Sequence, residues 1–179
     1  MWLIVPVLLF SSSLVASKVF TACELAQKLN DRFTDQITKG LASREEVSKY
    51  YTDIPLLVCI AGYHNFSTSN VVVTDDRVAH NGIFGIVPHD LKGDPALLLD
   101  DNIDLDVKTF LEKVLYVAGS LYRNENNRNF YDKLCTYPEV EYVSCYLNNY
   151  VFGRYRVPIP LNPNLLYKTY QNRTIEVPW

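Results

Sequence analysis

The chain has 179 residues, 48% of them hydrophobic, and a formal net charge of −3. This length fits one domain with a buried core plus an appendage. The charge is uneven, because residues 18–145 carry a net charge of −6 and residues 146–179 carry +3. The negative charge of residues 18–145 argues against a protein that is attracted electrostatically to anionic cell walls.

The N-terminus has the pattern of a secretory signal peptide over residues 1–17. Residues 2–10 are nearly continuously apolar, and Val15-Ala16-Ser17 supplies small residues before a cleavage site at Lys18. The segment lacks Lys and Arg, so a membrane anchor is the alternative interpretation. Serines at positions 11–13 interrupt the apolar run, which is then short for a span of about 20 residues. We therefore expect a secreted, extracellular protein that leaves the membrane once its signal is removed.

The first half of the chain is predicted to be helical. Residues 18–30 carry an apolar stripe at helical spacing. A capping-box pattern at Ser43 and Glu46 predicts a short helix that runs to about residue 51. A separate helix is predicted over residues 54–63, because Pro55 is tolerated in a first helical turn.

A small sheet and two more helices are predicted in the second half. Turn signals at Asp75-Asp76 and Asn81-Gly82 separate three β-rich runs. Helices are expected again beyond a linker over residues 90–99. The predicted class is therefore α+β, with antiparallel strands over residues 71–74, 77–80 and 83–87, and helices over residues 104–116 and 124–134.

Residues 147–179 are predicted to form an extended C-terminal arm. Prolines at positions 158, 160, 163 and 178 forbid a continuous helix. Basic and aromatic residues alternate over residues 152–157. In a secreted protein this pattern is not expected to bind nucleic acid. We expect it to pack on the acidic body or to dock an extracellular partner.

The four cysteines are expected to form disulfides in a secreted protein. Four cysteines allow three pairings, and their spacing does not choose among them.

Two stretches of the sequence resemble one known family. K-V-F-x-x-C-E-L-A-x-x-L at residues 18–29 and N-G-I-F-G-I-V at residues 81–87 resemble the c-type lysozymes and α-lactalbumins, glycoside hydrolase family 22. The resemblance covers about residues 18–146 and implies a helical lobe plus a small β-lobe. It also implies the disulfides of the helical lobe, which here are Cys23–Cys145 and Cys59–Cys135.

The resemblance places histidines where the family has its two catalytic carboxylates. His64 lies five residues after Cys59, and His80 lies two residues before Gly82. Glycosidases of this type need one carboxyl group as acid and another to stabilise a cationic transition state. A histidine can donate a proton, but it cannot supply that anion. The chain therefore looks like a divergent member that lacks both catalytic groups.

The family's cleft is altered at further positions. Gly85 and Val87 stand where the family binds sugar with Gln and Asn. Arg128 and Tyr131 stand near the positions of the family's cleft tryptophans. We expect the cleft to include Asn65, Asn81, Gly85, Val87, Arg128 and Tyr131.

The sequence contains candidate sites for glycosylation, calcium and zinc. Asn65 and Asn172 lie in glycosylation sequons, which marks the chain as a candidate glycoprotein. Calcium-binding relatives carry acidic groups in the loop that leads into the helix predicted here over residues 104–116. Asp100, Asn102 and Asp106 match those positions. Helix-start acidity explains the same residues more simply, so no cofactor is expected. Zinc held by His64 and His80 is an alternative that two ligands alone support poorly.

Three functions compete. The first is a secreted, catalytically inactive lysozyme-like protein that binds a glycan or a protein partner. The second is a glycosidase with altered or weak hydrolysis of β-1,4-linked N-acetylmuramide or chitooligosaccharide chains. The third is a structural extracellular protein. The histidines at positions 64 and 80 favour the first.

Overall fold

The computed structural model describes residues 17–74, 77–91, 94–117, 122–136 and 140–159. The predicted signal peptide up to residue 16, the turn at Asp75-Asp76, the sequon at Asn172 and the arm beyond residue 159 lie outside the described residues. The elements are α1 (Ala22–Thr38), α2 (Arg44–Tyr63), β1 (Val71–Val73), β2 (Ala79–Asn81), η1 (Pro88–Asp90), η2 (Pro95–Leu98), α3 (Asp104–Phe110), η3 (Leu111–Leu115), α4 (Glu125–Leu134), β3 (Val140–Leu147) and β4 (Tyr150–Pro158).

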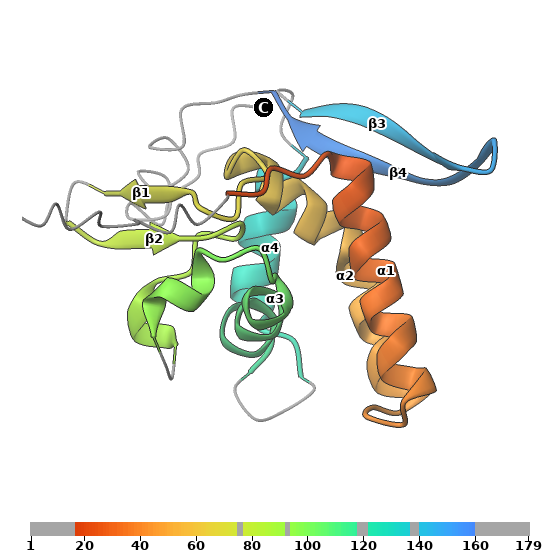
Figure 1. Cartoon of the computed structure of the whole chain (residues 1–179), viewed down its shortest axis with the longest axis horizontal. Coiled ribbons are helices and arrows are strands. Elements are labelled where there is room, and N and C mark those ends of the chain that lie inside the picture. Colours follow the sequence, from red (N-terminus) through yellow and green to blue (C-terminus); the bar gives the residue numbers. More distant parts are fainter. Residues whose placement is uncertain (1–16, 75–76, 92–93, 118–121, 137–139, 160–179) are drawn as a thin grey trace, which may run out of the picture.

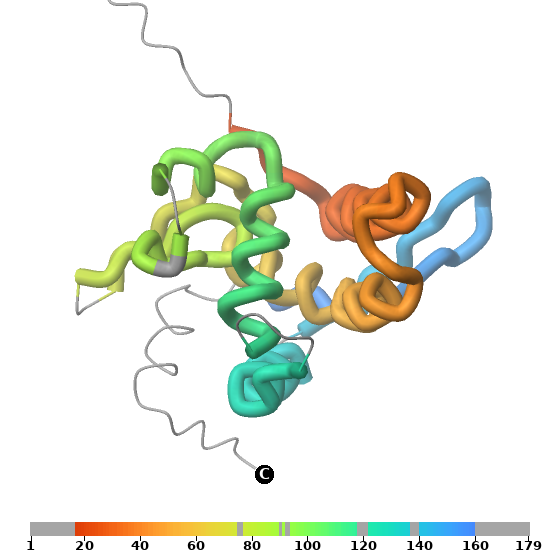
Figure 2. The backbone as a smooth tube through the Cα atoms, turned by 90° about the horizontal axis from the view of Figure 1, so that it is seen from below, coloured from red at the N-terminus to blue at the C-terminus, as the bar shows by residue number. Residues whose placement is uncertain are grey.

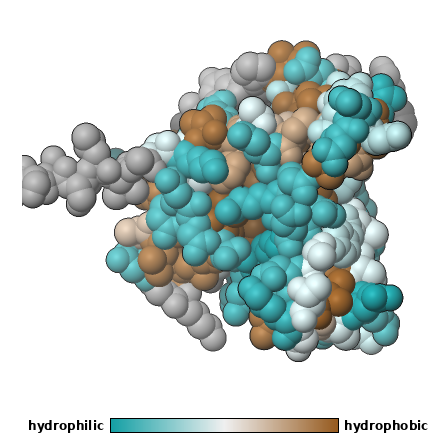
Figure 3. Space-filling view, turned by 45° about the vertical axis from the view of Figure 1, so that its right-hand side comes forward, coloured by the Kyte–Doolittle hydropathy of each residue, from teal (hydrophilic) through white to brown (hydrophobic). Residues whose placement is uncertain are grey.

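The molecule is mixed α and β, as predicted. Helices α1 and α2 lie side by side at one end, and the β1–β2 pair lies at the other (Figure 1). Helix α3 and the π-helical turn η3 stand between these two parts, with α4 next to them (Figure 2). Hydrophilic side chains are interspersed with small hydrophobic groups on the face in Figure 3. No helix in the described part of the chain is long and apolar enough to cross a membrane.

Helix α1 begins at a capping box and outlasts its predicted length. The Glu24 amide donates to Thr21 Oγ1 at 3.2 Å, and the Thr21 amide donates to Glu24 Oε2 at 2.7 Å. The helix continues to Thr38 rather than ending at residue 30. Its apolar stripe extends to Phe33, which is fully buried, and this burial favours the extra turns.

The predicted helices over residues 43–51 and 54–63 are one helix, α2. The capping box is confirmed, since the Ser43 side chain accepts from the Glu46 amide. The prediction of a break was wrong, and Pro55 lies inside the helix. An interior proline costs about 3 kcal/mol. Burying the neighbouring Ile54 and Leu57 contributes about 1.5–3 kcal/mol each, which offsets that cost.

The sheet near the histidines has two strands, so the prediction of three was wrong. Strands β1 and β2 pair antiparallel, with Val72 opposite His80. Residues 83–87 form a tight turn instead of a strand. Gly82 and Gly85 adopt positive φ angles of 75° and 62°, which extended strands do not contain. A single bridge between Asn81 and Ile86 closes this turn, with hydrogen bonds of 2.9 and 2.8 Å.

Gly82 offers a first test of this turn. A methyl group at position 82 would lie 2.3 Å from the Leu98 carbonyl oxygen and 2.5 Å from Asp106 Oδ1. Gly40 has a similar φ of 67° but no atom within 4 Å of such a methyl group. In urea unfolding we expect Gly40→Ala to cost about 1 kcal/mol and Gly82→Ala at least about 2 kcal/mol. Equal losses would mean that the neighbours yield and only the backbone angle matters.

The remaining helices match their predicted ranges closely. Helix α3 continues as η3, so the pair covers the predicted 104–116 segment to within one residue. Helix α4 lies within the predicted 124–134 segment and is capped by Asn124, whose side chain accepts from the Asn127 amide.

The start of the C-terminal arm is extended, but it is a paired strand rather than a free segment. Strands β3 and β4 form an antiparallel hairpin, turned at Asn148 and Asn149 with φ angles of 50° and 68°. The hairpin spans residue 146, so the division between domain and arm at this residue remains a prediction. The Arg156 guanidinium donates to the Tyr142 hydroxyl and to the Cys135 carbonyl oxygen. This basic residue of the arm therefore packs on the body.

Two disulfides join these elements in the pairing that the resemblance implies. Cys23–Cys145 links α1 to β3, and Cys59–Cys135 links α2 to the end of α4. Each closes a long loop, which stabilises by about 4 kcal/mol in a chain-entropy account, although nested loops are not additive.

Candidate functional site: the histidine cleft

A pocket of about 330 Å³ opens where the β1–β2 end meets α3, η3 and α4. His64 and His80 both line it, although they come from different elements. We call this pocket the histidine cleft. Its described lining is His64, His80, Phe84, Gly85, Ile86, Val87, His89, Phe110, Lys113, Val114, Asn127, Phe130 and Tyr131.

His64 is a buried, neutral histidine. It caps the C-terminus of α2, and the chain reverses at Asn65 and Phe66, both with positive φ angles. The Asn70 side-chain amide lies 3.2 Å from His64 Nδ1, and with the amide nitrogen as donor the ring proton is on Nε2. Burial, and next the charge of His80, lower the pKa of His64 to about 3. At neutral pH this ring is therefore no source of the acidic proton that glycoside cleavage needs.

His80 is held by the tight turn beyond β2. Its Nδ1 lies 3.1 Å from the Gly85 carbonyl oxygen. A carbonyl only accepts, so Nδ1 carries the proton and Nε2 of the neutral ring is an acceptor. The positive φ angles of Gly82 and Gly85 bring this carbonyl back to the ring. The turn that replaces the predicted third strand thus fixes the orientation of His80.

Aromatic rings form one wall of the histidine cleft. Phe84 and Phe110 stack with ring centroids 5.3 Å apart, and Phe110 meets Tyr131 edge-on at 5.6 Å. Phe130 adds a further edge-on contact to Tyr131 at 5.0 Å. His89 and Lys113 are exposed, so the polar rim is neutral or basic. Among the described lining residues there is no aspartate or glutamate.

The predicted cleft residues divide into two groups. Gly85, Val87 and Tyr131 line the histidine cleft as expected. Asn65 is exposed, and Asn81 is buried with an Oδ1 that has no hydrogen bond within the described chain; neither lines the pocket. The cleft also uses His89, Lys113, Asn127 and Phe130, which the sequence analysis did not assign to it. Lys113, Asn127 and Phe130 lie in predicted helices, but helical spacing alone does not indicate which of them face a cleft, and His89 lies outside every predicted helix.

Arg128 was predicted to lie in the cleft and instead pairs with buried Asp53. The Arg128 guanidinium contacts Asp53 Oδ1, while the Tyr116 hydroxyl donates to Asp53 Oδ2 at 2.6 Å. Asp53 is 0% exposed. Burial, together with donation to this carboxylate, raises the pKa of Tyr116. The prediction missed this network because Asp53 was read as a position between two helices, whereas in the continuous α2 it faces inward.

Two of the three calcium candidates, Asp100 and Asn102, accept hydrogen bonds from the local backbone. Asp100 Oδ1 accepts from the Asn102 amide at 2.7 Å, and Asn102 Oδ1 accepts from the Asp104 amide at 3.1 Å. Asp106 is 1% exposed, and burial raises the pKa of its carboxyl to about 7. The described residues contain no group of three or more His, Cys, Asp or Glu that could hold a metal ion, the cleft histidines included.

Comparison with known proteins assigns no family. No family model matches the chain, and no curated protein matches it. Among solved structures, a lysozyme from Litopenaeus vannamei is similar, with a TM-score of 0.36 and 23% sequence identity over 51% of this chain and 67% of that chain. A likeness of this degree does not define a fold family. The proposals below therefore rest on the residues of this chain.

Proposed function

We propose that this protein is a secreted, lysozyme-like protein that binds a glycan in the histidine cleft without hydrolysing it. One observation carries the proposal: the described lining of the cleft has no carboxylate, and its buried histidine is neutral. A glycosidase of the family-22 type needs both an acid and an anion at this place. The cleft retains the aromatic and hydrogen-bonding groups that sugar binding uses.

The lysozyme-like assignment is supported by the sequence motifs and by the two disulfides. The spacings of His64 from Cys59 and of His80 from Gly82 match those of the family's catalytic carboxylates, and both histidines line one pocket. Secretion is supported by the apolar N-terminal segment and by the disulfides, which persist in oxidising compartments.

The chemistry of the cleft favours binding over cleavage. An oxocarbenium ion that develops beside His64 and His80 would meet two neutral rings, or a cation if His80 gains a proton. Neither offers the electrostatic stabilisation that a carboxylate provides. The half-buried Phe130 and Tyr131 rings, in contrast, can pack on the apolar face of a sugar ring.

The test is NMR spectroscopy of the full secreted chain with an N-acetylglucosamine hexamer. We expect amide shifts at cleft residues such as Gly85 and Asn127, and no product after a day. Phe130→Ala is expected to weaken binding at least about five-fold, because it removes one aromatic contact surface. Phe152→Ala is the matched control, since that half-buried ring lies on β4 outside the cleft.

Two outcomes would contradict the proposal. Product formation that requires His64 or His80 would make the chain an enzyme with altered chemistry. Absence of both shifts and product would reject glycan binding in the cleft.

A further inference from the structure

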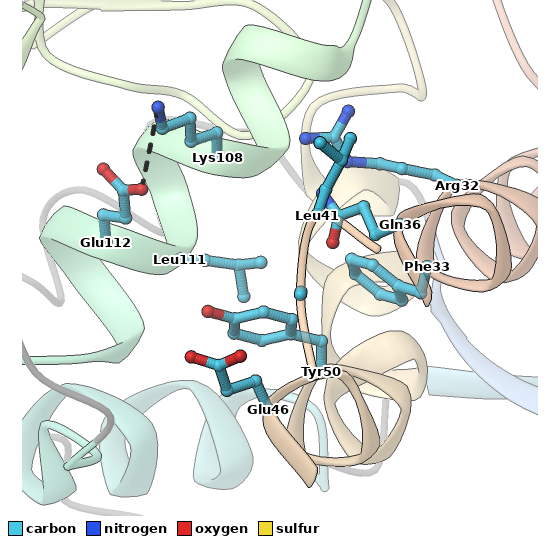
Figure 4. A pocket seen from close by; sticks show the side chains of 10 residues that line it. Arg32, Phe33, Gln36, Leu41, Glu46, Tyr50, Lys108, Leu111 and Glu112 are labelled. Atoms are coloured by element: carbon cyan, nitrogen blue, oxygen red, sulfur yellow. Dashed lines mark ion pairs between the residues drawn. The ribbon is translucent and has the colours of Figure 1, made fainter. Parts of the chain in front are cut away.

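A second pocket, of about 310 Å³, lies on the opposite side of α3 and η3 from the histidine cleft and shares no lining residue with it. Side chains from α1 and α2 face side chains from α3 and η3 across it (Figure 4). Seven of its ten lining residues belong to residues 32–50. We call it the helical pocket. Its volume is at the lower end for small-molecule sites, enough for one ring-sized ligand.

The floor of the helical pocket is apolar and partly aromatic. Phe33 and Leu111 are buried, at 1% and 5% exposure. The half-buried Tyr50 ring lies next to them, with its centroid 5.6 Å from that of Phe33 (Figure 4). A flat ligand with one apolar face can therefore rest on the Tyr50 ring, which is the accessible part of this floor.

Two polar groups around this floor, the Gln36 side-chain amide and the Tyr50 hydroxyl, lack hydrogen-bond partners within the described residues. The Arg32 guanidinium is held by Asp104, and its Nε is buried and out of reach of a ligand in the pocket. Burial, and then the carboxylates of Glu112 and Glu46, raise the pKa of Tyr50, so its hydroxyl keeps its proton as a donor. Donors and acceptors are thus available together.

The charges that line the helical pocket are balanced. Arg32 and Lys108 are positive, and Glu46 and Glu112 are negative. Lys108 lies 3.9 Å from Glu112, and the Glu46 carboxylate accepts from the Ser43 amide at 2.8 Å. A charged ligand would meet as much repulsion as attraction, whereas a neutral ligand with several hydroxyl groups can bond to both kinds of rim group.

We propose that the helical pocket binds a single neutral sugar ring. A pyranose has an apolar C–H face for the Phe33–Tyr50–Leu111 floor and adjacent hydroxyls that both donate and accept. An aromatic hydrocarbon would cover the Gln36 amide and the Tyr50 hydroxyl without offering either of them a hydrogen bond. A charged sugar would disturb the balanced rim. This site is independent of the glycan proposed for the histidine cleft.

The test is a titration of the isotope-labelled full chain with glucose, galactose and N-acetylglucosamine, each to 50 mM. We expect at least one neutral sugar to shift the amides of Gln36, Leu41 and Leu111 in a saturable way. Glucuronate and glucosamine, the charged analogues of glucose, are expected to bind at least about three-fold more weakly than glucose itself. Shifts confined to cleft amides such as Gly85 would support the cleft proposal and reject this one.

Two conservative variants test the polar contacts. Tyr50→Phe and Gln36→Ala remove groups with no hydrogen bond in the described chain, so the fold is expected to remain intact, as melting curves would check. Each substitution is expected to lower the affinity for the sugar about five-fold, because it removes a hydrogen bond to a sugar hydroxyl. Tyr51→Phe is the matched control, because the Tyr51 hydroxyl bonds Thr34 and does not line the pocket. Unchanged affinity in both pocket variants, or no shift of pocket amides by any neutral sugar, would overturn the proposal.

Discussion

Replacing Arg128 with leucine is expected to destabilise the protein by about 3–5 kcal/mol, because the change leaves the buried Asp53 carboxylate without its closest cation. Arg123 lies 3.9 Å from the same carboxylate, but its side chain is one-third exposed and donates to Thr52. It is therefore a poor substitute. The Tyr116 hydroxyl bond stays, yet a neutral donor does not balance a buried charge.

Urea unfolding of matched variants would measure this loss. Arg154→Leu is the control, since Arg154 is exposed on β4, and it is expected to change the free energy of unfolding by less than about 0.5 kcal/mol. In the double variant Asp53→Asn/Arg128→Leu the buried charge is gone, so much of the lost stability is expected to return. A loss below about 1 kcal/mol for Arg128→Leu alone would show that the pair contributes little.

The buried His64 and Asp106 side chains are expected to change the free energy of unfolding in opposite directions as the pH changes. The two effects therefore largely cancel. The folded pKa of His64, about 3, is below its ordinary 6.5. Between these values the unfolded chain binds more protons, so this group makes stability fall as the pH falls. The folded pKa of Asp106, about 7, is above its ordinary 3.8, so this group makes stability fall as the pH rises.

Each effect amounts to about 1.4 kcal/mol per pH unit while it acts. The two windows overlap between about pH 4 and 6.5, where the slopes have opposite signs. We therefore expect the unmodified protein to show a nearly level free energy of unfolding across this range. Single substitutions are expected to reveal the separate slopes.

Asp106→Asn leaves the His64 slope, and its stability is expected to fall by about 3 kcal/mol from pH 6.5 to 4. His64→Gln leaves the Asp106 slope, and its stability is expected to fall by a similar amount from pH 4 to 6.5 and to keep falling to about 7. Urea unfolding at half-unit pH steps, with EDTA present, would measure both. Level profiles in both variants would mean that neither group changes its pKa on folding.

The sequence predicted best where local signals decide the structure. The capping box at Ser43 and Glu46 depends only on neighbouring residues, and it forms as predicted. The helix predicted over residues 124–134 also forms, and the structure adds a cap at Asn124. The family resemblance predicted that His64 and His80 lie in one cleft, and both line the histidine cleft. A resemblance carries information about contacts between distant residues, which hydrophobic periodicity lacks.

Tertiary packing decided the features that the sequence did not predict. Pro55 is a helix breaker by local rules, yet the apolar residues around it keep α2 continuous. The run 83–87 is β-rich, but its two glycines with positive φ angles turn the chain to support His80. Arg128 was placed by analogy with a cleft residue, whereas a buried aspartate one helix away determines its position.

The Cys23–Cys145 disulfide, whose loop encloses the other one, also determines how the molecule carries mechanical force. A pull applied at residue 17 and at residue 159 passes from Cys23 directly to Cys145 through the sulfur–sulfur bond, across 122 positions of sequence. The histidine cleft and nearly all of the helical elements lie inside that covalent loop and bear none of the load. Stretching the ends can peel β4 from the body, but the cleft keeps its geometry under a tension that would unravel an uncrosslinked chain.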